Sequence, residues 1–114
     1  MTDGVRTIIY PVRDLVKAKA LYVALLGVEP TADWPSYVGF RVADQDVGLD
    51  PSGHSQGVTG AVVYWHVDDI AGRIEALVGA GAEVVQPVKD VGGGKLVASL
   101  RDADGNMIGL IQPA

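Results

Sequence analysis

The hydrophobic pattern of the first half of this chain predicts short strands around one helix. Val5–Val12 is rich in β-branched residues and runs into Pro11, which is typical of a strand that leaves its ladder. After Asp14, a favourable helix N-cap, apolar residues recur every three or four positions up to Gly27, which predicts an amphipathic helix ended by a glycine. Further strands are predicted at Val28–Ala32, Ser36–Ala43 and Asp46–Asp50, the last two joined by a turn at Asp44-Gln45.

The second half repeats this order after a linker. Residues 51–57 gather turn-forming residues and separate the two patterned regions. Ala61–Val67 is a continuous apolar strand, and Asp69 caps a second predicted helix that Gly79 or Gly81 ends. Three more strands are predicted at Glu83–Val88, Leu96–Leu100 and Met107–Gln112, with turns at 92–94 and 104–106.

The two halves also match residue by residue. Ile8-Ile9-Tyr10-Pro11-Val12-Arg13-Asp14-Leu15 corresponds to Val63-Tyr64-Trp65-His66-Val67-Asp68-Asp69-Ile70, Phe40-Arg41-Val42-Ala43-Asp44 to Leu100-Arg101-Asp102-Ala103-Asp104, and Gly48-Leu49 to Gly109-Leu110. One half alone cannot cover both faces of its sheet. We therefore expect a single α+β domain over 1–114, in which two paired β-α-β-β-β modules, about 5–50 and 61–113 with a linker at 51–60, form curved mixed sheets around a cavity.

Composition and charge exclude several classes of partner. The net charge is −5 and the basic residues are scattered, so no nucleic acid is expected as a partner. The chain has no cysteine, which removes disulfides, thiolate metal ligands and a thiol nucleophile. No apolar run approaches the roughly 20 residues that span a bilayer, and no signal pattern opens the chain. A soluble cytoplasmic protein without a membrane partner is expected.

Four motifs in register resemble the vicinal oxygen chelate superfamily, which includes glyoxalase I, extradiol dioxygenases, and fosfomycin- and bleomycin-resistance proteins. They are Pro11-Val12-Arg13-Asp14-Leu15, Ala24-Leu25-Leu26-Gly27, Val67-Asp68-Asp69-Ile70 and Asp102-Ala103-Asp104-Gly105-Asn106, the last with Ala103 where the family usually has proline. The resemblance covers nearly the whole chain and implies the paired-module fold. It also implies that such proteins commonly form homodimers.

The same resemblance places metal ligands at positions that lack donors here. Metal-using members carry His, Gln or Glu there, whereas this chain has Thr7, Val62, Gly109 and Gly48, or at most Leu49. A divalent ion needs three or more N or O donors converging on it. We therefore expect no metal and no other cofactor.

Strand alternation selects the residues that face the predicted cavity. Those in phase with Thr7 and Val62 face inward, whereas Tyr10 and Trp65 are expected to pack under the helices. Trp34, Tyr37 and Phe40 form an aromatic group for which core packing, a dimer interface and a ligand platform are all open. The predicted ligand-binding set is Ile9, Trp34, Tyr37, Phe40, Val62, Tyr64, His66 and Met107. His54 is expected to be a solvated loop residue.

These features favour a metal-independent binding protein for a small hydrophobic or aromatic compound, either sequestering an antibiotic or toxin or holding a metabolite. The alternative is a glyoxalase-like lyase or isomerase, or a dioxygenase-type enzyme, with an unusual metal or acid/base site. His66 and Tyr64 are the candidates for such a site. A third alternative is an interaction module whose interior is filled by side chains.

Overall fold

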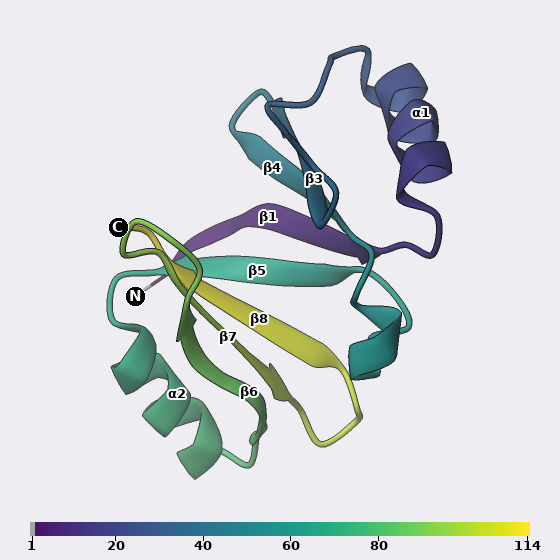
Figure 1. The fold of residues 1–114 in the computed structure, drawn as a ribbon. Helices are drawn as coiled ribbons and strands as arrows, with labels where there is room; N and C mark the ends of the chain where they lie inside the picture. Colours follow the sequence, from purple (N-terminus) through teal and green to yellow (C-terminus); the bar gives the residue numbers. More distant parts are fainter. Residues whose placement is uncertain (1) are drawn as a thin grey trace. The chain divides into compact units, whose positions relative to one another are not determined.

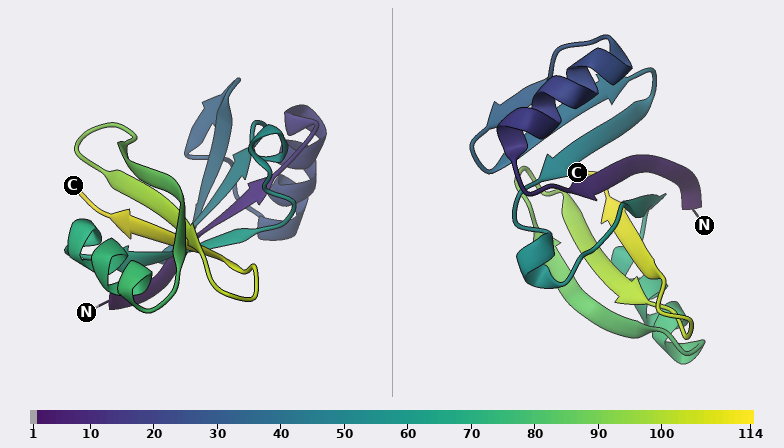
Figure 2. Two further views of the ribbon diagram at one scale, coloured as in Figure 1. Left: turned by 90° about the horizontal axis from the view of Figure 1, so that it is seen from below. Right: turned by 90° about the vertical axis from the view of Figure 1, so that its right-hand side faces the viewer.

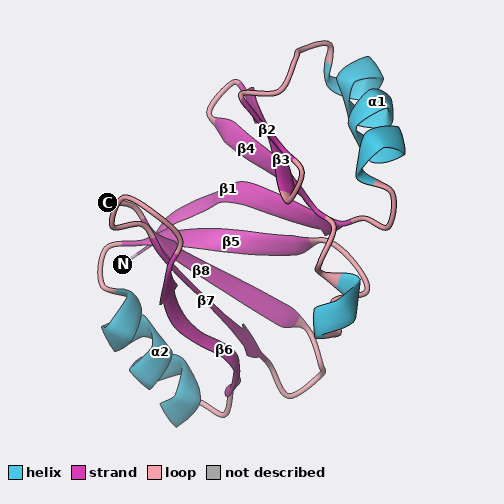
Figure 3. Cartoon of the chain, viewed as in Figure 1, coloured by secondary structure: helices cyan, strands magenta, loops and turns pink. Residues whose placement is uncertain are grey.

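A computed structural model describes residues 2–114 and shows two compact modules (Figure 1). The first module is Arg6–Val62, and the second is Val63–Ala114 together with the N-terminal residues up to Val5. Each combines one long helix with strands that pair both parallel and antiparallel (Figure 3). The predicted α+β class with mixed sheets is confirmed.

In the first module the strands follow the spatial order β2-β3-β4-β1. β1 runs parallel to β4, while β2 with β3 and β3 with β4 are antiparallel. The elements are β1 (Thr2–Pro11), α1 (Leu15–Leu26), β2 (Ala32–Trp34), β3 (Tyr37–Val42), β4 (Gln45–Asp50) and the 3-10 helix η1 (His54–Gln56).

Local signals at both ends define α1. The Asp14 carboxylate accepts a hydrogen bond from the backbone N–H of Lys17 at 3.0 Å, as the sequence predicts for an N-cap. Gly27 has φ 73° and donates its N–H to the Val23 carbonyl at 2.9 Å, which ends the helix. The helix packs against one face of the sheet (Figure 2, right), where Phe40 and Leu49 are fully buried.

The second module has the same order of elements, with the spatial strand order β5-β8-β7-β6. β5 is parallel to β8, and the other pairs are antiparallel. Asp69 caps the helix through the backbone N–H of Gly72 at 3.0 Å, and the Gln112 side chain accepts from Ile70 N at 2.9 Å. The elements are β5 (Val62–Val67), α2 (Ile70–Gly79), β6 (Glu83–Asp90), β7 (Leu96–Arg101) and β8 (Met107–Gln112).

Two local predictions were wrong in position. The predicted strand Val28–Ala32 is instead Ala32–Trp34, because Pro30 has no N–H to pair and the pairing with β3 begins at Thr31. The turn between β3 and β4 is Ala43-Asp44, since Val42 pairs with Gln45. Among the described residues, neither helix is long and apolar enough to cross a bilayer, and the cytoplasmic location stays a prediction.

Candidate functional site

The first module's sheet has one face against α1 and another turned away from it. The α1 side carries the core, with Val38, Phe40 and Leu49 packed beside Tyr10 and Val12. Because side chains alternate along a strand and register partners share a face, the intervening residues form the opposite face, which we call the distal face. Its members include Thr7, Ile9, Trp34, Tyr37, Gly39, Arg41, Asp46 and Gly48.

Two adjacent glycines form a shelf at the centre of the distal face. Gly39 of β3 pairs with Gly48 of β4, which pairs in turn with Ile9 of β1. The edge of the Tyr37 ring lies over both glycines. A Cβ atom on Gly48 would lie 2.1 Å from the Tyr37 hydroxyl and 2.6 Å from Ile9 Cδ1, and one on Gly39 would lie 3.0 Å from Tyr37 Cε2. The ring reaches this position only because both strands lack side chains there.

An exposed tryptophan lies beside this ring. Trp34 is the direct cross-strand partner of Tyr37, so the two side chains share the distal face. Trp34 is 64% exposed, whereas Tyr37 is partly buried. An exposed indole next to a partly buried phenol is a surface on which a flat apolar molecule can stack.

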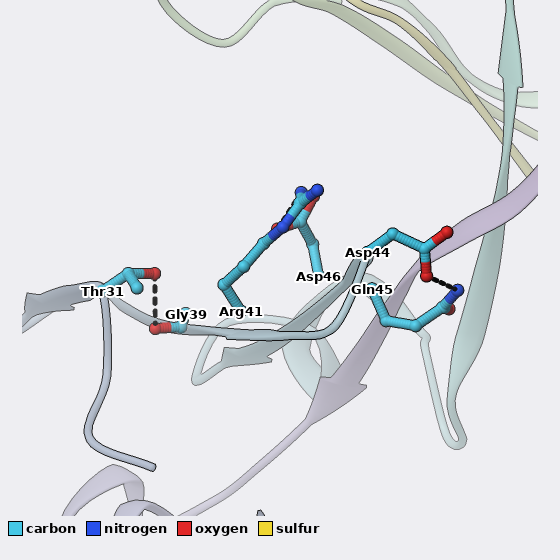
Figure 4. Close-up of polar contacts among 6 residues, drawn as sticks. All are labelled: Thr31, Gly39, Arg41, Asp44, Gln45 and Asp46. Atoms are coloured by element: carbon cyan, nitrogen blue, oxygen red, sulfur yellow. Dashed lines mark hydrogen bonds and ion pairs between the residues drawn. The ribbon is translucent and has the colours of Figure 1, made fainter.

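On the other side of the shelf lies an ion pair (Figure 4). Arg41 of β3 and Asp46 of β4 are register partners, and the Arg41 Nη1 atom donates to both Asp46 carboxylate oxygens at 3.0 Å. Their side chains are 51% and 39% exposed. Thr7, the partner of Asp46 in β1, is 7% exposed and extends this polar row. The distal face therefore presents an aromatic row, a glycine shelf and a charged row.

The positions that the family resemblance assigns to metal ligands do not fit a metal centre. Val62 and the two glycines Gly48 and Gly109 have no donor atom in their side chains, and Thr7 offers one neutral hydroxyl. The space beside Gly48 is taken by Tyr37 and Ile9, and that beside Gly109 by Tyr64. Within residues 2–114, no three His, Asp or Glu side chains gather in a way that could hold an ion.

The second module repeats the ring-over-glycine arrangement with a different tyrosine. Tyr64 pairs with Gly109, and a Cβ atom on that glycine would lie 2.6 Å from Tyr64 Cδ1. His66 lies two residues further along β5, beside Ile111, and its carbonyl accepts a hydrogen bond from Thr2 Oγ1 at 2.8 Å. Tyr64 and His66 therefore share a sheet face, as the alternation predicts.

Phe40 does not lie on the same face as the other two residues of its predicted aromatic group. It is 1% exposed and packs in the core on the α1 side of the sheet. Its assignment as a ligand-binding residue is corrected to core, because it lies an odd number of positions from Tyr37 along β3 and so points to the opposite face. Trp34 and Tyr37 stay predicted ligand contacts.

The remaining predicted residues have mixed environments. Val62 is 5% exposed at the start of β5, and Met107 is partly buried at the start of β8. Tyr10 packs in the core as predicted, in contact with the Tyr22 ring at a centroid distance of 5.2 Å. Trp65 does not pack in the core as predicted, because it is 39% exposed and lies outside the core cluster of its module.

His54 differs from the expectation of a solvated loop residue. It begins η1 inside the linker and is partly buried. Its Nδ1 atom is inaccessible to solvent and has no hydrogen-bond partner among the described residues. The 3-10 turn buries part of a side chain that the polar composition of the linker suggested was in water.

The sequence analysis missed the ion pair and the role of the two glycines. Both depend on the register between β3 and β4, which the two-residue turn at Ala43-Asp44 sets. Placing that turn correctly would have paired Arg41 with Asp46 and Gly39 with Gly48. The sequence therefore contained the information, but the turn was predicted one residue too far along the chain.

Comparison with protein families gives one match over almost the whole chain. The model of the Glyoxalase/Bleomycin resistance protein/Dioxygenase superfamily matches residues 4–110. No curated protein matches.

Solved structures share the fold at low sequence identity. A superfamily member from Vibrio splendidus is 18% identical with a TM-score of 0.70, over 96% of this chain and 99% of that one. Methylmalonyl-CoA epimerase from Mycobacterium tuberculosis is 18% identical with a TM-score of 0.72, over 99% of this chain and 89% of the epimerase. The Mn(II)-bound glyoxalase from Novosphingobium aromaticivorans is 20% identical with a TM-score of 0.73, over 97% of this chain and 39% of the glyoxalase.

Proposed function

Because the chain belongs to the Glyoxalase/Bleomycin resistance protein/Dioxygenase superfamily, we propose that it binds a small hydrophobic or aromatic molecule without a metal. Binding would serve to sequester a toxic compound or to hold a metabolite. The observation that carries this proposal is the distal face of the first module, where the exposed Trp34 adjoins Tyr37 above the shelf of Gly39 and Gly48.

The chemistry of this face supports recognition by shape. Trp34 and Tyr37 supply flat apolar area, and the two glycines allow the Tyr37 ring to lie close against the sheet. Polar side chains are confined to one flanking row, where Arg41 and Asp46 can fix the orientation of a guest. Small-molecule sites commonly combine a mostly apolar wall with a few well-placed polar groups.

Metal independence is supported by the missing donors. A neutral hydroxyl at Thr7 and the absence of side-chain donors at Gly48, Val62 and Gly109 leave a divalent ion without a ligand set. Elemental analysis of protein purified without chelators tests this part of the proposal. Stoichiometric zinc, nickel, manganese or iron would contradict it and favour the glyoxalase-like enzyme instead.

Tryptophan fluorescence can test ligand binding at this face. The chain has two tryptophans, so Trp65→Phe leaves Trp34 as the only reporter, and Trp34→Phe leaves Trp65 as a matched control. A panel of aromatic compounds should include at least one that changes Trp34 emission saturably. The Trp34→Phe protein should bind that compound more weakly. No saturable response across a broad panel would contradict the proposal.

We further propose a homodimer. The support is one flank of α1, where Leu21 and Leu25, one helical turn apart, are 64% and 71% exposed. Apolar side chains grouped on a helix surface are stabilised by a partner chain. Sedimentation analysis should give a dimer that Leu21→Glu and Leu25→Glu dissociate, whereas Lys17→Glu on the same helix should have no effect. A wild-type monomer at micromolar concentration would contradict it.

A further inference from the structure

The ion pair on the distal face leaves most of its arginine's donors unused. Arg41 reaches both oxygens of Asp46 through the single atom Nη1. Within residues 2–114, no other group bonds to its guanidinium, so Nη2 and Nε are available, and the side chain is 51% exposed. A guanidinium binds a planar oxyanion best through two parallel N–H groups. In Arg41 the Nε and Nη2 N–H groups, which form such a pair, are available to bind an anion.

We propose that the ligand of this face is a flat aromatic compound carrying a carboxylate or a similar planar oxyanion, which Arg41 binds through its open edge. This inference rests on the proposed function, since it names the ligand class of the same site. Asp46 orients the guanidinium through Nη1 and leaves the other nitrogens to the guest.

The spacing of the rows supports this assignment. Gly39 and Arg41 lie two residues apart on the same face of β3, which is about 6.7 Å along a strand. Because the Tyr37 ring itself extends over Gly39 and Gly48, a guest ring stacked on its outer face would place a directly attached carboxylate near Arg41. No linker between the ring of the guest and its carboxylate is needed.

The acidic groups nearby are less suited to hold a cationic guest. Both oxygens of Asp46 already accept from Arg41. Asp50, the next carboxylate along β4 on this face, accepts from Ser52 N at 2.8 Å and from Ser52 Oγ at 2.7 Å. The charged group in this row that still has available hydrogen-bonding atoms is the Arg41 guanidinium, and its N–H donors favour an anionic guest.

The test compares three probes that share one ring system: naphthalene-2-carboxylate, its neutral carboxamide, and the 2-naphthylmethylammonium cation. Isothermal titration calorimetry at low salt should show the carboxylate binding roughly tenfold more tightly than the carboxamide, as expected for a charge-assisted contact at a half-exposed site. The cation should bind most weakly. This comparison uses the wild-type protein alone.

Two arginine variants then assign the effect. Arg41→Met should remove the preference for the carboxylate over the carboxamide. Arg101→Met is the matched control, because Arg101 is the counterpart of Arg41 in the repeat but lies in the other module, where its register partners are Met107 and Glu83. It should keep the tenfold preference.

The outcomes separate the two proposals. If the carboxamide binds as tightly as the carboxylate, or if Arg41→Met keeps the preference, the anionic ligand class is wrong while aromatic binding stands. If none of the three probes binds saturably, both this inference and the aromatic-binding function are contradicted for this ring size. In ¹⁵N-edited spectra of the wild type, the carboxylate should also shift the Arg41 Nε–H signal, and an unmoved signal would overturn the assignment.

Discussion

Replacing Gly48 by alanine should test the arrangement of the distal face more directly than any other single change. Glycine inside a strand ordinarily costs about 0.5–1 kcal/mol relative to alanine, so this substitution would stabilise an ordinary strand position. At Gly48 the new methyl group would lie 2.1 Å from the Tyr37 hydroxyl and 2.6 Å from Ile9 Cδ1. We therefore expect destabilisation instead.

The size of the effect follows from the displacement required. Non-bonded atoms pack at roughly 3.5–4.0 Å, so the Tyr37 hydroxyl must move by more than about 1 Å from its present place. Both obstructing atoms are side-chain ends, so the ring can swing away rather than distort the backbone. Overpacking of this kind typically costs about 1–3 kcal/mol. After the intrinsic gain from alanine is subtracted, a net loss of about 1–2 kcal/mol is expected.

A double-mutant cycle in urea provides the assay. Gly48→Ala, Tyr37→Ala and the double variant are compared with wild type by equilibrium unfolding followed by circular dichroism. The loss from Gly48→Ala should shrink by about 1 kcal/mol when Tyr37 is already alanine, because the hydroxyl that obstructs the methyl group is gone. Gly60→Ala is the matched control, since a Cβ atom there would meet nothing within 4 Å.

One result would refute the reasoning. If Gly48→Ala leaves stability unchanged or raises it, the Tyr37 ring does not occupy the shelf in solution. The same conclusion follows if the loss is equal with and without Tyr37, since the cost would then come from another source.

Three further predictions follow from individual residues. Phe40→Leu should lower stability by about 1 kcal/mol in chemical unfolding but leave the affinity for an aromatic probe unchanged, because Phe40 lies in the core, and a large loss of affinity would contradict that. Ala43→Gly should raise the unfolding free energy by up to about 1 kcal/mol, because Ala43 has φ 54°, and a lower midpoint would argue against this turn. The Asn106 side chain and backbone N–H lower the pKa of Asp102, so the stability difference between wild type and Asp102→Ala should be largest above pH 3.8 and shrink as the pH falls further, because the ionised carboxylate is the stronger acceptor; a difference that does not change with pH would contradict this linkage.

The elements that the sequence predicted well are those with a local cause. Asp14 and Asp69 are followed three residues later by an N–H that each carboxylate accepts, and both helices begin where those residues predict. Gly27 ends the first helix through its positive φ. Neither feature depends on the rest of the fold, so a short window of sequence was enough.

The distal face was harder to predict because it depends on register. The aromatic residues Trp34, Tyr37 and Phe40 lie close together in sequence, but an alternating strand places Tyr37 and Phe40 on opposite faces. The Arg41–Asp46 pair requires the turn between β3 and β4 to be placed to the residue, since a turn at Asp44-Gln45 would pair Arg41 with Gly48 instead.

The internal repeat separates what belongs to the fold from what belongs to the site. Gly48 and Gly109 are counterparts, and each lies under the edge of a tyrosine ring although the two rings come from different strands. Glycine weakens a strand, yet both halves have one at this position and both place a tyrosine ring over it. We infer that the glycine allows the ring to pack closely against the backbone. The ion pair is not repeated in the same form, because Arg41 bonds to Asp46, whereas the register partners of Arg101 are Met107 in β8 and Glu83 in β6. Since a carboxylate is a cross-strand partner of this arginine in both modules, its presence alone does not indicate a ligand. What distinguishes the first module is the hydrogen-bonded contact of Arg41 Nη1 with both Asp46 oxygens, which fixes the guanidinium that the proposed site needs.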